Sequence, residues 1–345
     1  MKKHFIKILA AAVLLAFGAT SCSKDDEETS IGSVVYAVGY ESNGTKDVAK
    51  LWTNGRATNL SNGTNNQQTN SIFLSGNDTY VCGYETVSDG NVGIEYVARL
   101  WKNGVAKNLS DSSNWAFAQQ VFVSDGDVYV AGSQFNGAHY VAKYWKNGVA
   151  KNITDGSTNA HFNSVFVSGS DVYLAGYEEK TNGKKVAKLW KNGVAWAMSG
   201  GSNDAIAVKI LISGSDVYAV GYEFNSEKTV AVLWKNGLYT GLTDGYNDAQ
   251  ARDIVLVGSD VYVAGYESNG SKTVAKYWKN GVAVSLTNGT NNAGANTLYV
   301  HEGNVYVAGF ESNGSKNVAK IWKNGVATAL SDGQNNAVVR SLVVK

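Results

Sequence analysis

The stretch that decides the fold is Val261-Tyr-Val-Ala-Gly-Tyr-Glu267, followed after a short polar loop by Val274-Ala-Lys-Tyr-Trp-Lys-Asn-Gly-Val-Ala283. Its apolar residues alternate with a step of two, and they are mostly β-branched or aromatic, which is typical of β-strands. The Asn280-Gly281 pair favours a type I′ hairpin turn, because both central residues of that turn need positive φ. The stretch therefore predicts short antiparallel strands.

The same unit occurs seven times, with 44 to 49 residues between successive copies. Its first tyrosine recurs at Tyr36, Tyr80, Tyr129, Tyr173, Tyr218, Tyr262 and Tyr306. Its tryptophan recurs in step, at Trp52, Trp101, Trp145, Trp190, Trp234, Trp278 and Trp322. Two markers that drift together define a structural period, and four short strands fit into each copy. Such a period is the signature of a propeller blade.

The sixth copy illustrates the predicted strands, with C near 274–279 and D near 281–286, and with A near 296–301 and B near 304–310 taken from the start of the seventh copy. The chain enters the repeat at strand B, near Tyr36, and ends on a lone strand A at 337–345. The two partial blades complete one another, and closing the ring removes exposed sheet edges. The sequence therefore predicts an all-β, seven-bladed propeller over residues 33–345, closed by the C-terminal strand.

The N-terminal region has the order of a targeting segment. Lys2, Lys3 and Lys7 precede an apolar run from Ile8 to Phe17, and small residues precede Cys22. The run is too short to span a membrane, so 1–21 are predicted to be a signal peptide. The charged residues 22–32, which contain no aromatic residue, are predicted to be a solvated tether. An ordinary secretory cleavage, with Cys22 incidental, is the alternative.

Residues 1–28 also resemble a known class of secreted protein. The residues before Cys22 resemble the lipobox of bacterial lipoproteins, although Ala19 stands where leucine is usual. The acidic run after Cys22 resembles the signal that sends lipoproteins of the Bacteroidetes to the outer leaflet of the outer membrane, and the repeat resembles uncharacterised surface lipoproteins of that group. The resemblance implies that Cys22 carries a diacylglycerol and an acyl chain such as palmitate, and that the protein is anchored at the cell surface.

Charge and composition exclude several functions. Thirty Lys and Arg residues balance 29 Asp and Glu residues in a chain of 345, and no basic run occurs, which argues against nucleic-acid binding. Cys82 is the only cysteine besides Cys22, and it is predicted to be a small buried hydrophobe rather than half of a disulfide. No metal-ligand spacing, phosphate-binding loop or catalytic triad is readable, so we expect no metal, cofactor or catalytic residue.

Features repeated in every blade are interpreted first as parts of the scaffold. The meander puts the short A–B and C–D turns on one face and the longer B–C loops and crossovers on the other. An Asn column in the crossovers either lines the mouth of the channel or bonds its own loop backbone. Glu and Lys or Arg columns at the strand ends are predicted to form ion pairs worth about 0–1 kcal/mol each. The tryptophan is predicted to be a wedge between blades with its N–H bonded to a loop.

Departures from the repeat mark the candidate site. Blade 2 has a longer B–C loop over 86–96, blade 3 replaces Tyr-Glu by Ser133-Gln134, and aromatic and His residues enter the loops of blades 2–4. The predicted ligand-binding residues are Trp115, Phe117, His139, Tyr140, Asn159, His161 and Phe162. Rings and amides of this kind suit a glycan or a peptide, through stacking and hydrogen bonds. The alternative is sequence drift, with these rings packed beneath the longer loop.

Three functions are compatible with this sequence. The leading hypothesis is a surface-anchored, non-enzymatic binding propeller whose ligand is a glycan or a peptide. The alternatives are a glycan-processing enzyme with its site on the same face, and a structural or assembly lipoprotein that acts through protein contacts. Propeller sites assemble from scattered residues, so the fold alone does not decide among the three.

Overall fold

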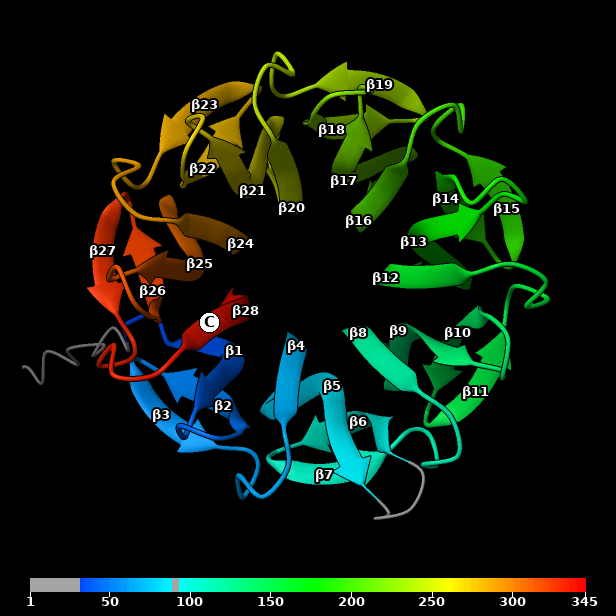
Figure 1. Ribbon diagram of the computed structural model, residues 1–345, viewed down its shortest axis with the longest axis horizontal. Coiled ribbons are helices and arrows are strands. Elements are labelled where there is room, and N and C mark those ends of the chain that lie inside the picture. Colours follow the sequence, from blue (N-terminus) through cyan, green and yellow to red (C-terminus); the bar gives the residue numbers. More distant parts are fainter. Residues whose placement is uncertain (1–31, 89–92) are drawn as a thin grey trace, which may run out of the picture. The chain divides into compact units, whose positions relative to one another are not determined.

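The computed structural model describes residues 32–88 and 93–345. Their strands form seven four-stranded antiparallel sheets around a central axis (Figure 1), which confirms the predicted seven-bladed propeller. The predicted signal peptide, the predicted tether and Cys22 lie outside the described residues, except for Gly32 at the end of the predicted tether. Within the described part of the chain, no helix is long and apolar enough to cross a membrane.

The strands follow one another from the centre of each blade to its rim. Blade 1 contains β28 (Ala337–Val344), β1 (Val35–Ser42), β2 (Asp47–Thr53) and β3 (Arg56–Asn59). Blade 2 contains β4 (Gln67–Ser75), β5 (Asp78–Ser88), β6 (Ile94–Lys102) and β7 (Val105–Asn108). Blade 3 contains β8 (Ala116–Ser124), β9 (Asp127–Phe135), β10 (Tyr140–Lys146) and β11 (Val149–Asn152). Blade 4 contains β12 (Ala160–Ser168), β13 (Asp171–Glu179), β14 (Lys185–Lys191) and β15 (Val194–Ala197).

The remaining three blades repeat this plan. Blade 5 contains β16 (Ala205–Ser213), β17 (Asp216–Phe224), β18 (Thr229–Lys235) and β19 (Leu238–Gly241). Blade 6 contains β20 (Ala249–Val257), β21 (Asp260–Ser268), β22 (Thr273–Lys279) and β23 (Val282–Ser285). Blade 7 contains β24 (Ala293–His301), β25 (Asn304–Ser312), β26 (Asn317–Lys323) and β27 (Val326–Ala329).

The C–D turns have the predicted type I′ geometry. In blade 6, Asn280 and Gly281 have φ of 51° and 81°. The Asn280 side chain then ties the turn to the neighbouring hairpin: its Oδ1 accepts the backbone N–H of Val261 at 2.8 Å, and its Nδ2 donates to Asp260 Oδ1 at 2.8 Å. Asparagine is therefore selected here both for its tolerance of positive φ and for its side-chain amide.

The hydrophobic core lies between the blades. Each of the seven repeated tryptophans is at most 2% exposed and belongs to a cluster that joins its own blade to the preceding one. Trp52 Nε1 donates to the Leu330 carbonyl, and Trp101 Nε1 donates to the Leu60 carbonyl, both at 3.1 Å. The Nε1 atoms of Trp145, Trp234, Trp278 and Trp322 are buried without a hydrogen-bond partner in the described structure. The predicted wedge is therefore confirmed for the rings, whereas the predicted N–H bond to a loop is confirmed for Trp52 and Trp101. Burying a side chain of this size contributes roughly 1.5–3 kcal/mol.

The C-terminal strand closes the ring, as predicted. β28 pairs antiparallel with β1 from Val35↔Val344 to Glu41↔Ala337, so the last strand of the chain is the innermost strand of the first blade. Two backbone bonds between Val34 and Lys345, at 2.7 and 2.9 Å, extend the pairing to the end of the chain. Val339, Leu342 and Val344 pack in the cluster between blades 7 and 1.

The innermost strands differ from the prediction in one respect. β24 begins at Ala293, three residues before the predicted start near 296, and contains a bulge between Ala295 and Thr297. The bulge interrupts the step-of-two pattern, so this pattern does not identify the residues of β24 that precede the bulge. Every innermost strand carries an equivalent bulge. A bulge re-aims side chains, and here it lies where the strands line the channel.

The predicted strand-end ion pairs form in five blades. They are Lys50–Glu41 at 2.9 Å, Arg99–Glu85, and Lys188–Glu178, Lys276–Glu267 and Lys320–Glu311 at 2.5 Å. Blade 3 has Lys143 bonded instead to Gln134 Oε1 at 2.6 Å, and burial lowers the pKa of this lysine. In blade 5, Val232 replaces the lysine, and burial raises the pKa of Glu223.

Candidate functional site

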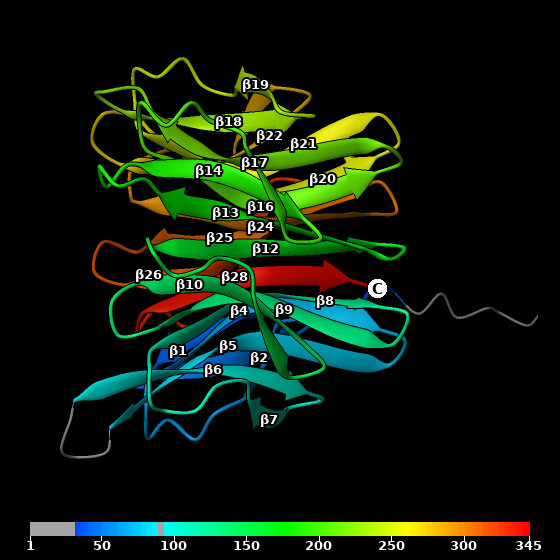
Figure 2. The same cartoon turned by 90° about the vertical axis from the view of Figure 1, so that its right-hand side faces the viewer.

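The long-loop face carries the candidate site. The B–C loops and the crossovers both lie on this face, and Figure 2 shows the β5–β6 hairpin projecting from it. The additional residues of blade 2 lengthen the strands of this hairpin, because the pairing continues through Thr86↔Tyr96 to Ser88↔Ile94. The hairpin thereby brings Tyr96 beside the rings of blade 3.

Eight rings from blades 2, 3 and 4 form one continuous cluster, which we call the aromatic strip. It consists of Tyr84, Tyr96, Trp115, Phe117, Phe135, Tyr140, His161 and Tyr177. Successive centroids are 4.6–6.2 Å apart, which is the range of favourable ring contacts. No ring of the strip is fully buried, so the strip offers partly exposed aromatic surface across three blades.

Trp115 is the most exposed ring of the strip at 40%. At the equivalent position, most crossovers have Asn or Asp, and its side-chain oxygen accepts the first backbone N–H of strand C. Asn159 Oδ1, for example, accepts the Tyr140 N–H at 2.9 Å. An indole cannot accept this bond. Trp115 instead contacts the rings of Tyr96 and Phe135, at 5.8 and 6.0 Å between centroids.

His161 connects the outer part of the strip to the channel. Its ring lies between Tyr140, at 4.6 Å, and Tyr177, stacked at 5.1 Å. Ser133, which replaces the repeated tyrosine in blade 3, places its Oγ 2.8 Å from His161 Nδ1. Burial, with a smaller contribution from Lys185, lowers the pKa of His161 to about 4. The imidazole is therefore neutral at pH 7, and its Nδ1 can accept a hydrogen bond from the Ser133 hydroxyl.

The structure brings together four of the seven predicted residues: Trp115, Phe117, Tyr140 and His161. Asn159 is occupied within the loops, because its Oδ1 accepts the Tyr140 N–H and its Nδ2 donates to Glu179 Oε2 at 2.9 Å. His139 is half-buried in the loop before β10, where its backbone N–H donates to Asn136 Oδ1 at 2.8 Å. Phe162 requires a correction: it is fully buried and packs edge-on against Trp190, so its ring cannot contact a ligand.

Tyr84 and Tyr177 were not predicted as site residues. Both stand at the tyrosine that follows glycine in most blades, so a search for residues that differ between blades does not find them. Tyr96 lies in the longer loop of blade 2, and Phe135 stands in the altered loop of blade 3, where the sequence did signal a departure. Only the fold shows that Tyr84, Tyr96 and Phe135 contact Phe117, Trp115 and Tyr140 respectively, and that Tyr177 stacks on His161.

The Asn column of the crossovers does not supply the Asx bonds of these loops, and none of its asparagines lines the cavity in the channel. The Asx bonds in these loops are made three residues earlier, for example by Asp155, whose Oδ1 accepts the Ser157 N–H at 2.9 Å. Asn65 donates to Glu85 Oε1 at 3.0 Å, and the cavity in the channel is lined by other residues.

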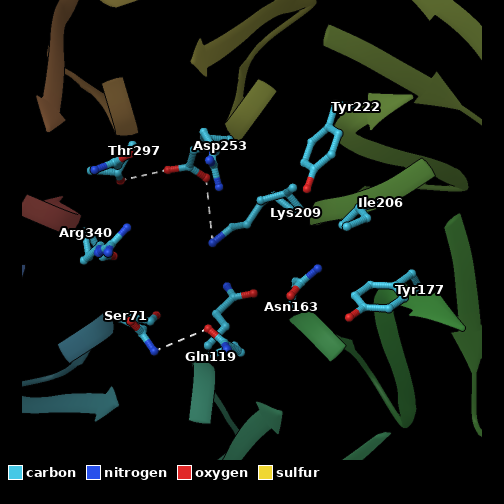
Figure 3. A pocket seen from close by; sticks show the side chains of 16 residues that line it. Ser71, Gln119, Asn163, Tyr177, Ile206, Lys209, Tyr222, Asp253, Thr297 and Arg340 are labelled. Carbon is cyan, nitrogen blue, oxygen red and sulfur yellow. Dashed lines mark hydrogen bonds and ion pairs between the residues drawn. The ribbon is translucent and has the colours of Figure 1, made fainter. Parts of the chain in front are cut away.

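That cavity is the second feature of the site. It has a volume of about 260 Å³, is partly open to solvent, and is lined by residues of the innermost strands together with Tyr177 and Tyr222. Figure 3 shows Lys209 and the hydroxyls of both tyrosines directed into it, with Arg340 at its wall. Among the described residues, no group of three His, Cys, Asp or Glu side chains could hold a metal ion. Because Tyr177 belongs to both, the cavity adjoins the aromatic strip.

Comparisons with known proteins support the fold assignment and no more specific conclusion. No protein-family model matches the chain, and no curated protein matches it. Among solved structures, the chain is similar to the β-propeller domain of the Trilobed protease from Pyrococcus furiosus, with 12% identity, a TM-score of 0.55, and coverage of 88% of this chain and 93% of that one.

Two longer enzymes contain a similar fold. A puromycin-hydrolyzing peptidase from Mycobacterium tuberculosis matches with 9% identity and a TM-score of 0.58, over 86% of this chain and 54% of that one. The acylaminoacyl peptidase of Pyrococcus horikoshii matches with 11% identity and a TM-score of 0.53, over 87% and 51%. The chain therefore spans about half the length of these peptidases. At such identities the similarity defines the class, a β-propeller, and nothing more specific.

Proposed function

We propose that this protein is a non-enzymatic binding propeller that holds a glycan or a peptide on the long-loop face of blades 2–4. The aromatic strip carries the proposal, because it gathers eight rings from three blades and leaves them partly exposed. Aromatic faces bind the apolar faces of sugar rings and the side chains of peptides, and an exposed ring of this kind contributes about 1–3 kcal/mol when a ligand covers it.

The departures from the repeat support a binding role over simple drift. Trp115 replaces an oxygen acceptor that ties the loops of other blades together, and Ser133 and His161 have changed as a bonded pair. The Trp115 change gives up a repeated scaffold contact and adds exposed aromatic surface, whereas the buried Ser133 bonds the His161 ring within the strip. The opposite face keeps its Asn-Gly turn in every blade.

The decisive variant is Trp115→Ala, tested with the protein as residues 23–345 on glycan and peptide arrays and then by calorimetry on the ligand found. We expect about a tenfold or greater loss of affinity, with Tm changed by no more than about 2 °C, since an exposed loop ring has little core to lose. Trp196→Ala is the matched control, because Trp196 is similarly exposed, at 38%, but lies on the outer strand β15.

A clear fall in Tm with unchanged binding would show that Trp115 packs only as scaffold. Incubation of each array ligand with the protein, followed by mass analysis of the products, distinguishes binding from processing. Hydrolysis that is lost in Trp115→Ala would favour the glycan-processing alternative instead.

We further propose that Cys22 anchors the propeller to the outer membrane, on the strength of the sequence resemblance described above. One acyl chain gives only marginal attachment, so the anchor needs the diacylglycerol as well, at about 0.8 kcal/mol per buried CH₂. Cys22→Ser should move the protein from the membrane fraction to the soluble fraction. A variant that stays in the membrane fraction and remains unprocessed would mean that a different segment anchors the protein.

A further inference from the structure

The wall of the central channel is held together by a ring of side chains. In each blade the residue after the bulge of the innermost strand occupies one position, which we call the lock position. In six blades its oxygen accepts a backbone N–H of the next blade. The acceptors and donors are Ser71 and Val121 (3.4 Å), Gln120 and Val165 (3.0 Å), Ser164 and Ile210 (3.0 Å), Asp253 and Leu298 (3.1 Å), Thr297 and Leu342 (3.3 Å), and Ser341 and Ile72 (3.3 Å).

Blade 5 breaks this ring, because its lock position is Lys209. An ammonium group has three donors and no acceptor, so it cannot take the N–H of Ile254. That N–H donates instead to Asp253 Oδ1, in its own blade, at 3.0 Å. Lys209 Nζ lies 3.7 Å from the same oxygen and points into the cavity (Figure 3). The lysine therefore replaces a contact between blades with a positive charge in the channel.

Two arginines add to this charge. Arg252 and Arg340 stand at the bulge itself in blades 6 and 1, and each guanidinium lies 5.7 Å from a tyrosine ring, that of Tyr266 and that of Tyr40. In the described structure the Nε atom of each arginine is buried without a hydrogen-bond acceptor. At the same position blades 2, 4 and 7 have asparagine, which bonds the next blade, as Asn296 does to the Val339 carbonyl at 2.7 Å.

The carboxylates near these cations already accept hydrogen bonds from neighbouring groups. Among the described residues that line the cavity, Asp253 is the only carboxylate, against three cations. Its Oδ1 accepts from Ile254, and its Oδ2 accepts from Leu298 and from the Thr297 hydroxyl at 2.8 Å. At the rim, Asp47 accepts from Gln68 at 2.6 Å, and Asp204 accepts the Lys185 N–H at 2.9 Å. The lining thus has an excess of two positive charges, three minus one, in a partly desolvated space.

We propose that the channel is a binding site for a small hydroxylated carboxylate, of the sugar-acid class. The arginines match the planar carboxylate, and Lys209 supplies a further donor at the centre. Amides and the hydroxyls of Tyr177 and Tyr222 line the same cavity and suit the hydroxyl groups of such a ligand. A volume of about 260 Å³ accommodates one ring of this size. The proposal does not depend on ligand binding by the aromatic strip.

The test is calorimetry with glucuronate as probe, and with glucose and inorganic phosphate as comparison ligands. Lys209→Ser inserts the residue that blades 1, 2 and 4 have at the lock position, so it restores the acceptor for Ile254 and should melt at or above the temperature of the parent. Arg340→Asn inserts the residue of blades 2, 4 and 7 at the bulge. Lys272→Ser removes the same charge from an exposed loop and is the matched control.

We expect the parent and Lys272→Ser to bind glucuronate equally, with affinity that falls as salt is added. Lys209→Ser and Arg340→Asn should each lose about tenfold or more, because the ligand charge is then left incompletely paired. Failure of the parent to bind glucuronate, equal binding of glucose, phosphate binding as tight as glucuronate binding, or full affinity in a folded Lys209→Ser would each overturn the proposal. Trp115→Ala should leave this affinity unchanged, which separates the channel from the aromatic strip.

Discussion

At the scale of single residues, His161 should make the free energy of unfolding depend on pH. Its pKa is lowered to about 4 by burial, whereas in the unfolded chain it is about 6.5. Between these values the unfolded chain binds a proton that the folded protein does not, so the free energy of unfolding should fall as the pH is lowered from about 6.5 to 4. Above pH 6.5 the His161 side chain is mainly neutral in both the folded and the unfolded protein, so it should add little pH dependence to the free energy of unfolding.

His161→Gln removes this titration while keeping a group that can bond Ser133, and blades 2 and 6 have glutamine at the same position. Urea unfolding at pH 7, 5.5 and 4.5 should show a smaller fall for this variant than for the parent. His139→Gln, in a loop outside the strip, should behave like the parent. Parallel pH profiles for the parent and His161→Gln would contradict the conclusion that burial lowers the pKa of His161.

The site could be predicted only in part, and the reason is visible in one pair of neighbours. His161 and Phe162 both depart from the repeat, yet successive residues of a strand point to opposite faces. His161 therefore joins the strip, while Phe162 enters the core beside Trp190. Departure from a repeat locates a region, but it does not say which side chains of that region are accessible. Lys209 was missed because its position became meaningful only with the ring of acceptors in view.

At the scale of the elements, the glycine of strand B decides whether the bulge can form. A Cβ at Gly265 would lie 2.0 Å from the Gln250 carbonyl oxygen and 3.0 Å from the Trp278 ring. The six equivalent glycines have the same clash, at 1.9–2.0 Å from the paired carbonyl. The residue is required by close approach of the two backbones rather than by positive φ.

Gly265→Ala should therefore destabilise the protein by about 3 kcal/mol or more, since neither the backbone carbonyl nor the buried tryptophan can move freely. Gly200→Ala is the matched control, because a Cβ there meets nothing within 4 Å, and its effect should stay within about 0.5 kcal/mol. Chemical denaturation of both variants measures the difference. Equal midpoints would show that the inner strands can shift to absorb the added methyl group.

The sequence predicts strands B, C and D of each blade more closely than it predicts the innermost strand. Asn-Gly turns and β-branched runs identify strands B, C and D closely, as in β22 and β23, because the local pattern and the fold agree there. The innermost strands carry bulges and polar side chains such as Asn296 and Thr297, whose partners are in the neighbouring blade. Local patterns cannot encode contacts made across blades.

At the scale of the whole molecule, the ring is held by interactions that cross from each blade to the next, and blade 1 is completed only by the last strand. Removing 337–345 deletes β28 and with it Val339, Leu342 and Val344 from the last inter-blade cluster. It also removes both the Thr297–Leu342 and the Ser341–Ile72 bonds of the channel wall.

The truncated chain should lose several kcal/mol of stability, because the apolar surface of one strand returns to water at about 25 cal/mol per Å² and the inner edge of β1 loses its partner strand. Thermal melting of parent and truncated chain measures the loss, and the unpaired edge should also raise the tendency to aggregate. A synthetic peptide of residues 337–345, added in excess, should raise the Tm of the truncated chain, whereas the same peptide with Val339 and Leu342 changed to Asp should not. A truncated chain that melts with the parent would mean that the ring does not depend on the C-terminal strand for closure.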